Sequence, residues 1–142
     1  MPTITLIFAA CAALLNLWLA IRCGRVRTKE GISHGDGGNG LLSRRMRAQL
    51  NFAENAPVVL VLVLALELTG MATLWLWLLS ATFIVGRILH ALGMDPEGSN
   101  WMRGVGIMIS MLVTLILVGF ALYTGYALMG VNAAPSSIAV QV

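Results

Sequence analysis

Charged residues are scarce in this chain, and their scarcity excludes a soluble protein. Only 11% of the 142 residues are Asp, Glu, Lys or Arg, whereas a soluble domain carries about 25%. Hydrophobic residues make up 58% of the chain, and the mean hydropathy is +0.87. The polar surface is too small for a protein in water. We therefore expect an integral membrane protein with a single domain, residues 1–142.

Cysteine is also nearly absent, which excludes a disulfide framework. Cys11 and Cys23 both fall on or just after the first apolar stretch. A helix there would hold them about 18 Å apart, at roughly 1.5 Å per residue, and that separation is too large for a disulfide bond. No basic segment precedes the stretch from Ile4 to Ile21, so we predict a membrane anchor rather than a cleaved signal peptide.

Four apolar stretches predict four helices that cross a membrane. Each is about as long as the roughly 20 residues that a bilayer requires, or longer. We expect helices over about residues 3–23, 41–69, 72–92 and 101–129, followed by a flexible tail, residues 130–142. Glu67, near the end of the second helix, is expected to face water. The predicted fold class is all-α, an integral membrane four-helix bundle.

Positive charge is missing from one side of the expected membrane. All nine Lys and Arg residues lie in the loop 24–40, at the end of the first or third helix, or at the start of the second or fourth. Cytoplasmic loops carry an excess of Lys and Arg, so we predict both termini outside and the basic loops in the cytoplasm. Residues 35–40 match G-x-G-x-x-G. No strand precedes them, so we expect a flexible turn rather than a dinucleotide site.

Polar residues recur at helical spacing within the second helix. Arg47, Asn51 and Glu54 follow one another at i, i+4 and i+7, so they share one face, and Arg44 extends the row by one turn. Ionisable groups at a helix centre cost roughly 2.5–3.5 kcal/mol each on membrane-insertion scales. A chain that carries several of them in register is expected to build a polar site.

The third and fourth helices supply three more polar residues. Arg87 and His90 share a face near the inner end of the third helix, and Arg103 lies near the start of the fourth. We expect these faces to meet the second helix in one cavity at the cytoplasmic surface. Structural ion pairs between Glu54 and either Arg47 or Arg87 are the alternative, as is a hydrogen-bonded core role for His90.

Such a cavity suits a small ligand with more than one carboxylate. The planar guanidinium of Arg binds carboxylates in bidentate fashion, and Glu54 is able to hold an ammonium group. Glutathione has two carboxylates, one ammonium and a thiol, so it matches this set of side chains. A free thiol titrates near about 8.5, and a neighbouring cation lowers that value by roughly 1–3 units.

The second helix carries a recognisable motif. The segment R-A-Q-L-N-F-A-E-N-A-P, residues 47–57, resembles the R-A-x-x-N-x-x-E-x-x-P signature of the MAPEG family, the membrane-associated proteins of eicosanoid and glutathione metabolism. Residues 86–91 resemble the family's third-helix motif, and residues 35–38 and 67–70 resemble its bacterial members. The resemblance covers about residues 3–129. It implies a homotrimer with glutathione bound between subunits near the cytoplasmic face.

The resemblance also implies roles for individual residues. Arg103 would stabilise the glutathione thiolate as the catalytic residue, and no metal is expected. The residues expected to bind glutathione are Arg27, Arg47, Asn51, Glu54, Arg87 and His90. Some members have hydroxyl-bearing residues where this chain has Asn55, Met94 and Gly104. Their loss argues against a dedicated prostaglandin or leukotriene synthase.

These observations predict a glutathione-dependent membrane transferase or peroxidase. It would conjugate or reduce lipophilic electrophiles that arrive from the bilayer, and the expected location is the cytoplasmic membrane of a bacterium. A non-catalytic membrane module that binds a small anion or lipid headgroup is the alternative. A proton-coupled exporter is a third hypothesis. Such a protein needs an unpaired carboxylate deep in a helix, but Glu54 has arginines within reach and the first predicted helix has no acid.

Overall fold

The computed structural model describes residues 1–71 and 73–132, which form four helices that run up and down. The helices are α1 (Thr3–Glu30), α2 (Gly40–Leu68), α3 (Leu74–Gly93) and α4 (Trp101–Asn132). Each is long and apolar enough to cross a membrane, so the predicted all-α membrane four-helix bundle is confirmed. Most of the predicted flexible tail, from residue 133, lies outside the described residues.

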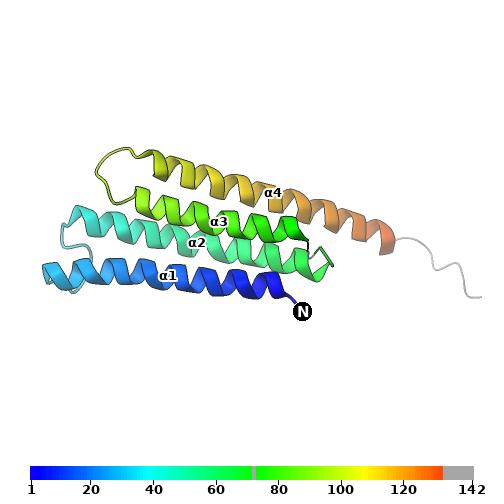
Figure 1. The fold of residues 1–142 in the computed structure, drawn as a ribbon, viewed down its shortest axis with the longest axis horizontal. Coiled ribbons are helices and arrows are strands. Elements are labelled where there is room, and N and C mark those ends of the chain that lie inside the picture. The colour runs from blue at the N-terminus through cyan, green and yellow to red at the C-terminus, as the bar shows by residue number, and fades with distance from the viewer. Residues whose placement is uncertain (72, 133–142) are drawn as a thin grey trace, which may run out of the picture.

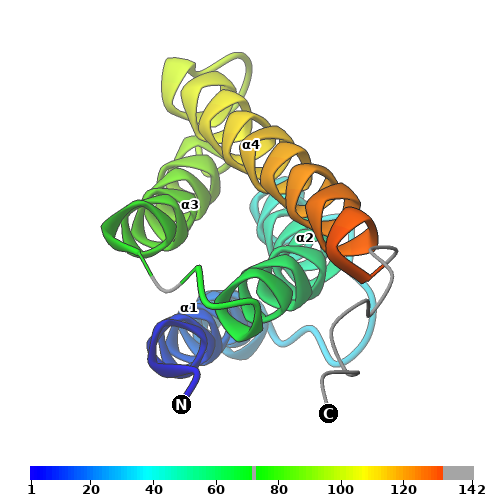
Figure 2. The ribbon, with the colours of Figure 1, turned by 90° about the vertical axis from the view of Figure 1, so that its right-hand side faces the viewer.

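Helices α2 and α3 form the middle of the bundle, and α1 and α4 lie on opposite sides of them (Figures 1 and 2). Both outer helices pack against α2 and α3, and within the described ranges α1 and α4 do not touch each other. Figure 1 shows the α1–α2 connection and the α3–α4 turn at the same end of the bundle. We call this end, which residues 31–39 and 94–100 close, the basic end.

Apolar side chains fill the centre and also cover the outside. Phe8 and Phe83 meet edge to face in the core, with ring centroids 5.9 Å apart. Leu14 and Leu115 are about two-thirds exposed, at 67% and 66%. Lipid tails are as apolar as leucine side chains, so an exposed apolar surface of this kind suits a bilayer and not water.

Helix α1 is longer than the sequence predicts. It continues to Glu30 rather than ending at residue 23, and Val26 of this extension is buried against Cys23 and Leu42. Gly31 ends it with a φ of 66°, a left-handed conformation that glycine adopts readily. The loop is therefore shorter than the predicted 24–40. Asn39 closes it by accepting a hydrogen bond from the backbone N–H of Leu42 at 2.9 Å, which caps α2.

The prediction that Glu67 faces water is wrong. Its side chain is buried, with 6% of the residue exposed. Its carboxylate accepts hydrogen bonds from the backbone N–H groups of Ile4 and Thr5, both at 2.8 Å, and from the Thr5 hydroxyl at 2.7 Å. The first N–H groups of a helix have no partner inside the helix. Glu67 of α2 therefore caps the start of α1.

Candidate functional site

Residues from three helices line one cavity near the basic end. The cavity has a volume of about 370 Å³, and we call it the arginine pocket. Its lining residues are Arg47, Leu50, Asn51, Glu54, His90, Met94, Arg103 and Ile107. Five of the seven predicted site residues thus lie around the same space. The two that do not line it are Arg27 and Arg87.

Helix α2 supplies the most polar wall of the arginine pocket. Arg47 and Glu54 are exposed and Asn51 is half-buried, as expected for three residues on one helical face. In the part of the chain that the structure describes, Glu54 forms no ion pair, either with Arg47 or with Arg87. The alternative that these charges form structural ion pairs is therefore not met within the chain. Their charged groups remain free to contact a ligand.

Arg87 lies behind the pocket rather than in its lining. It is 3% exposed and donates a hydrogen bond from Nη2 to the side-chain oxygen of Asn51. Its Nε has no hydrogen-bond partner among the described residues. Arg87 instead lines a neighbouring groove of about 420 Å³ between α2 and α4, which shares Asn51 and Ile107 with the arginine pocket. The expectation that Arg87 lines the same cavity is therefore corrected. Arg87 contacts Asn51, which lines the arginine pocket, but does not line the pocket itself.

His90 and Arg103 face the pocket from α3 and α4. His90 is 4% exposed, and its Nδ1 finds no hydrogen-bond partner within residues 1–71 and 73–132. Among these residues, Nδ1 therefore lacks the partner that the alternative, a hydrogen-bonded core histidine, would give it. Buried polar atoms in proteins are nearly always hydrogen-bonded, so an unpartnered ring nitrogen beside a cavity points to a ligand or water there.

Two glycines bring the backbones of α3 and α4 into direct contact. A Cβ atom built on Gly93 would lie 2.2 Å from the backbone nitrogen of Arg103, and one on Gly106 would lie 2.4 Å from that of His90. No side chain fits in either place. The two helices therefore approach closely enough for His90 and Arg103 to share one wall of the arginine pocket.

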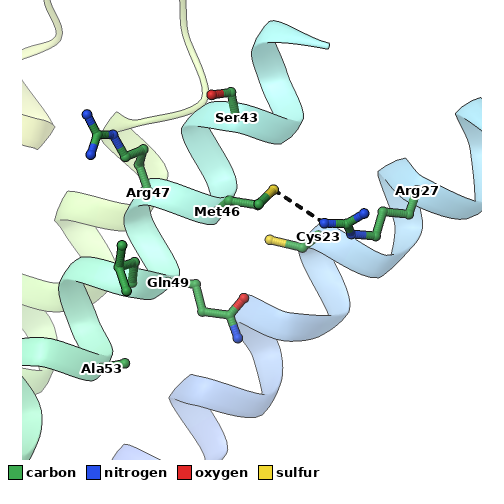
Figure 3. Close-up of a pocket in the computed structure, with 8 residues that line it drawn as sticks. Cys23, Arg27, Ser43, Met46, Arg47, Gln49 and Ala53 are labelled. Atoms are coloured by element: carbon green, nitrogen blue, oxygen red, sulfur yellow. Dashed lines mark hydrogen bonds between the residues drawn. The ribbon is translucent and has the colours of Figure 1, made fainter. Parts of the chain in front are cut away.

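Arg27 lines a second cavity, between α1 and α2, which shares Arg47 and Leu50 with the arginine pocket. We call it the α1–α2 pocket; its volume is about 510 Å³. Figure 3 shows Arg27 and Cys23 of α1 facing Met46 of α2, while Arg47 points away from them. Arg27 donates a hydrogen bond to the Met46 sulfur at 3.4 Å. Within one chain, Arg27 does not line the cavity that holds Arg103, so its role in binding glutathione, which the resemblance implies for a site between subunits, stays a prediction.

A cluster of charges around Asp95 was missed by the sequence analysis. The Asp95 carboxylate accepts two hydrogen bonds from Arg45, at 3.0 and 2.9 Å, and pairs with Arg22 at 2.6 Å. Arg44, predicted to extend the polar row, instead donates to the backbone oxygen of Asp95. Partial burial raises the pKa of Asp95, but the two guanidiniums outweigh burial and hold that pKa below its usual value.

Comparison with known proteins agrees with this architecture. The class defined by the fold and the cavity is a four-helix integral membrane protein with a cationic pocket near one end. The MAPEG family model matches residues 5–123, so the chain belongs to the MAPEG family. No curated protein matches the chain closely enough to supply a more specific relative.

Proposed function

We propose that this protein binds glutathione in the arginine pocket and uses its thiolate against lipophilic electrophiles or hydroperoxides. The observation that carries the proposal is the convergence of Arg47, Glu54, His90 and Arg103 on one cavity, in which Glu54 forms no ion pair with any described residue. Membership of a family associated with glutathione supports it. The charged groups of glutathione also have oppositely charged partners among the side chains of the pocket.

Each charged group of the pocket has a counterpart on glutathione. Arg47 is free to bind a carboxylate through its fork of N–H donors, and Glu54 is free to bind the ammonium. Asn51 uses its side-chain oxygen on Arg87, so its NH₂ group remains available to a second carboxylate. Arg103 supplies a positive charge for the sulfur. The pocket thus offers cations to the anionic groups and an anion to the cationic group.

Arg103 would act by stabilising negative charge on sulfur. Ionisation releases the thiol proton to solvent, and the thiolate is the nucleophile. In a transfer reaction the sulfur forms a bond to an electrophilic carbon, and the leaving group departs with its electron pair. In a peroxidase reaction, two glutathione molecules and one hydroperoxide give glutathione disulfide, an alcohol and water. Both reactions begin with the same thiolate.

The position of Arg27 supports an assembly of several copies. Arg27 lines the α1–α2 pocket and Arg103 the arginine pocket, and the two cavities meet at Arg47 and Leu50. Because Arg27 does not line the cavity that holds Arg103, a second copy would supply it to a site that contains both arginines. We propose a homotrimer in which the arginine pocket of one subunit faces Arg27 of the next. The distribution of Lys and Arg supports placing this site on the cytoplasmic side of the membrane. The resemblance of residues 35–38 and 67–70 to bacterial members of the family supports a bacterial cytoplasmic membrane.

The test is to add glutathione to the purified protein in detergent and follow the ultraviolet absorbance of the thiolate. We expect thiolate formation on binding and conjugation of an aryl halide. The Arg103→Ala variant should keep the glutathione affinity within about threefold and lose most of the thiolate, because one charge pair changes a pKa by roughly 1–3 units. Absence of both binding and turnover in the wild type would overturn the proposal.

A non-catalytic role is the second candidate. Met94 lines the arginine pocket, and Gly104 follows Arg103, so neither position brings a hydroxyl group to the thiolate. A module that binds a small anion or a lipid headgroup without turnover would use the same arginines. Tight glutathione binding with no product, across aryl halides and lipid hydroperoxides, would favour this candidate over an enzyme.

A further inference from the structure

The strongest network of charges in the described chain lies outside the arginine pocket, around Asp95. Arg22 of α1 and Arg45 of α2 both pair with the Asp95 carboxylate. Arg45 also donates a hydrogen bond from Nη1 to the backbone oxygen of Arg22, at 3.1 Å. The carboxylate in the α3–α4 turn thus joins two helices that are already linked to each other.

Burial makes this network specific rather than a loose surface contact. The Arg22 side chain is 8% exposed, and that of Asp95 is 31% exposed. Arg22 also donates to the backbone oxygen of Ala91 at 3.2 Å and lies over the ring of Trp18, 4.5 Å from its centroid. A guanidinium buried to this degree needs its partner, because losing one member of a buried pair leaves an uncompensated charge.

The network continues directly into both walls of the arginine pocket. Asp95 follows Met94, which lines the pocket, and lies two residues after Gly93, whose backbone touches that of Arg103. On the opposite wall, Arg45 lies two residues before Arg47. The ion pairs therefore tie the α3–α4 wall, which carries the thiolate-stabilising arginine, to the α2 wall.

We infer that Asp95, held by Arg22 and Arg45, is a positioning residue that keeps Arg103 at the correct distance from a thiolate bound in the arginine pocket. This inference rests on the proposed function and adds a residue to it. Asp95 does not contact the ligand. It acts by fixing the turn that leads into α4, and a displacement of about 1 Å at a catalytic group is enough to cost a large part of the rate.

The experiment compares Asp95→Ala with the matched variant Glu97→Gln in detergent. Glu97 lies in the same turn and pairs with Arg44 at 3.6 Å, but its side chain is 87% exposed, so its removal should change nothing. For Asp95→Ala we expect the pKa of bound glutathione to rise and kcat to fall about tenfold or more. The KM and Kd for glutathione should stay within about threefold, because the α2 contacts remain.

A second control separates positioning from general loss of stability. Glu67→Ala removes the cap of α1 at the opposite end of the bundle and should destabilise the protein without changing the thiolate pKa. If the Asp95→Ala variant does not fold, the Arg45→Lys variant is tested in its place. Lysine keeps the positive charge but loses the bidentate contact with Asp95. Arg45→Lys should raise the thiolate pKa in the same direction.

The two possible failures are distinguishable. A wild-type protein that forms no glutathione thiolate would overturn the proposed function, and this role with it. A wild-type protein that forms the thiolate, together with an Asp95→Ala or Arg45→Lys variant of unchanged thiolate pKa and kcat, would overturn the positioning role alone. A Glu67→Ala variant with the same thiolate shift as Asp95→Ala would also overturn it, because the effect would then follow stability.

Discussion

The side-chain oxygen of Asn51 accepts the hydrogen bond of a buried guanidinium, that of Arg87. The contact links α2 to α3 at the back of the arginine pocket. The Asn51 oxygen accepts a hydrogen bond from the buried cation, and the NH₂ group of Asn51 remains available to a ligand. One side chain thus serves both the packing of the helices and the pocket.

Replacing Asn51 should therefore destabilise the bundle. We expect Asn51→Leu to lower the free energy of unfolding by about 2 kcal/mol, since it leaves a buried charged donor without its acceptor. The matched control is Asn55→Leu, one turn further along α2. Asn55 is exposed, and among the described residues its side chain bonds only to the backbone oxygen of Asn51 in its own helix, so its replacement should change the free energy of unfolding by no more than about 0.5 kcal/mol. Thermal unfolding in detergent measures both. Equal stability of the two variants would contradict the prediction.

Glu67, which caps α1, should contribute to the free energy of unfolding about as much as Asn51 does. We expect Glu67→Ala to cost about 1–2 kcal/mol, because two backbone N–H groups of α1 lose their acceptor. Hydrogen exchange should rise at Ile4 and Thr5, while exchange in α4 stays unchanged. The control is Glu30→Gln, which removes a carboxylate from the other end of α1. A Glu67→Ala variant with unchanged exchange at these two amides would show that the cap contributes nothing.

The close approach of α3 and α4 makes a third prediction. Gly93→Ala should be strongly destabilising and should reduce activity, because its Cβ would collide with the backbone of Arg103. Gly119→Ala in α4 is the matched control, since no atom that the structure describes lies within 4 Å of a Cβ at that position. Alanine favours a helix over glycine by roughly 0.8–1.0 kcal/mol. Gly119→Ala should therefore be neutral or stabilising. A Gly93→Ala variant that unfolds at the wild-type temperature would refute the contact.

Acid should weaken the basic end of the bundle. Arg22 and Arg45 hold the pKa of Asp95 below its usual value, so the folded state favours the charged carboxylate. This contribution to stability is fully present above the unfolded pKa of about 3.9 and is lost as the pH falls through the lower folded value. Thermal unfolding followed from neutral pH to pH 3 should show the loss.

The control for this acid effect is another carboxylate. The hydrogen bond from the Gly38 N–H also lowers the pKa of Asp36, in the α1–α2 loop. Asp95→Asn should flatten most of the pH dependence, whereas Asp36→Asn should leave most of it. The opposite ranking would place the acid-sensitive contact in the loop.

A fifth prediction concerns the two sides of α2. If Arg27 completes the arginine pocket of a neighbouring subunit, Arg27→Ala and Arg103→Ala should each be poorly active alone. Mixed oligomers of the two variants contain some sites in which both arginines are intact. Co-expression should therefore give more activity than either variant, measured as aryl halide conjugation per bound glutathione. Activity of mixed oligomers no higher than the average of the two variants would mean that both arginines serve one chain.

Hydropathy and helical periodicity were sufficient to predict the four helices and the convergence of most of the pocket. The spacing of Arg47, Asn51 and Glu54 places them on one face wherever a helix forms. The end of α1 was missed because the charged residues after Cys23 lower the local hydropathy, whereas the helix continues through them and buries Val26. Gly31 was the available signal, since glycine commonly follows the last turn of a helix.

The remaining differences arise from helix rotation and from the path of a turn. Spacing does not say how far α3 is rotated, so it could not place Arg87 behind Asn51. The partners of Arg22 and Arg45 depend on where the α3–α4 turn directs Asp95, and no periodicity describes a turn. A carboxylate in a short connection surrounded by arginines was the only sequence signal for that cluster.

The cap on α1 has a consequence for biogenesis. Its acceptor, Glu67, is separated from Thr5 by almost the whole of the first two helices. While the ribosome is still translating the second segment, the opening turn of the first has exposed amide groups that nothing in the nascent chain satisfies. The first two helices should therefore reach their stable structure together, as a helical hairpin. A chain truncated before residue 67 should insert its first helix into the membrane, but the first turn of that helix should remain without its hydrogen-bond acceptor.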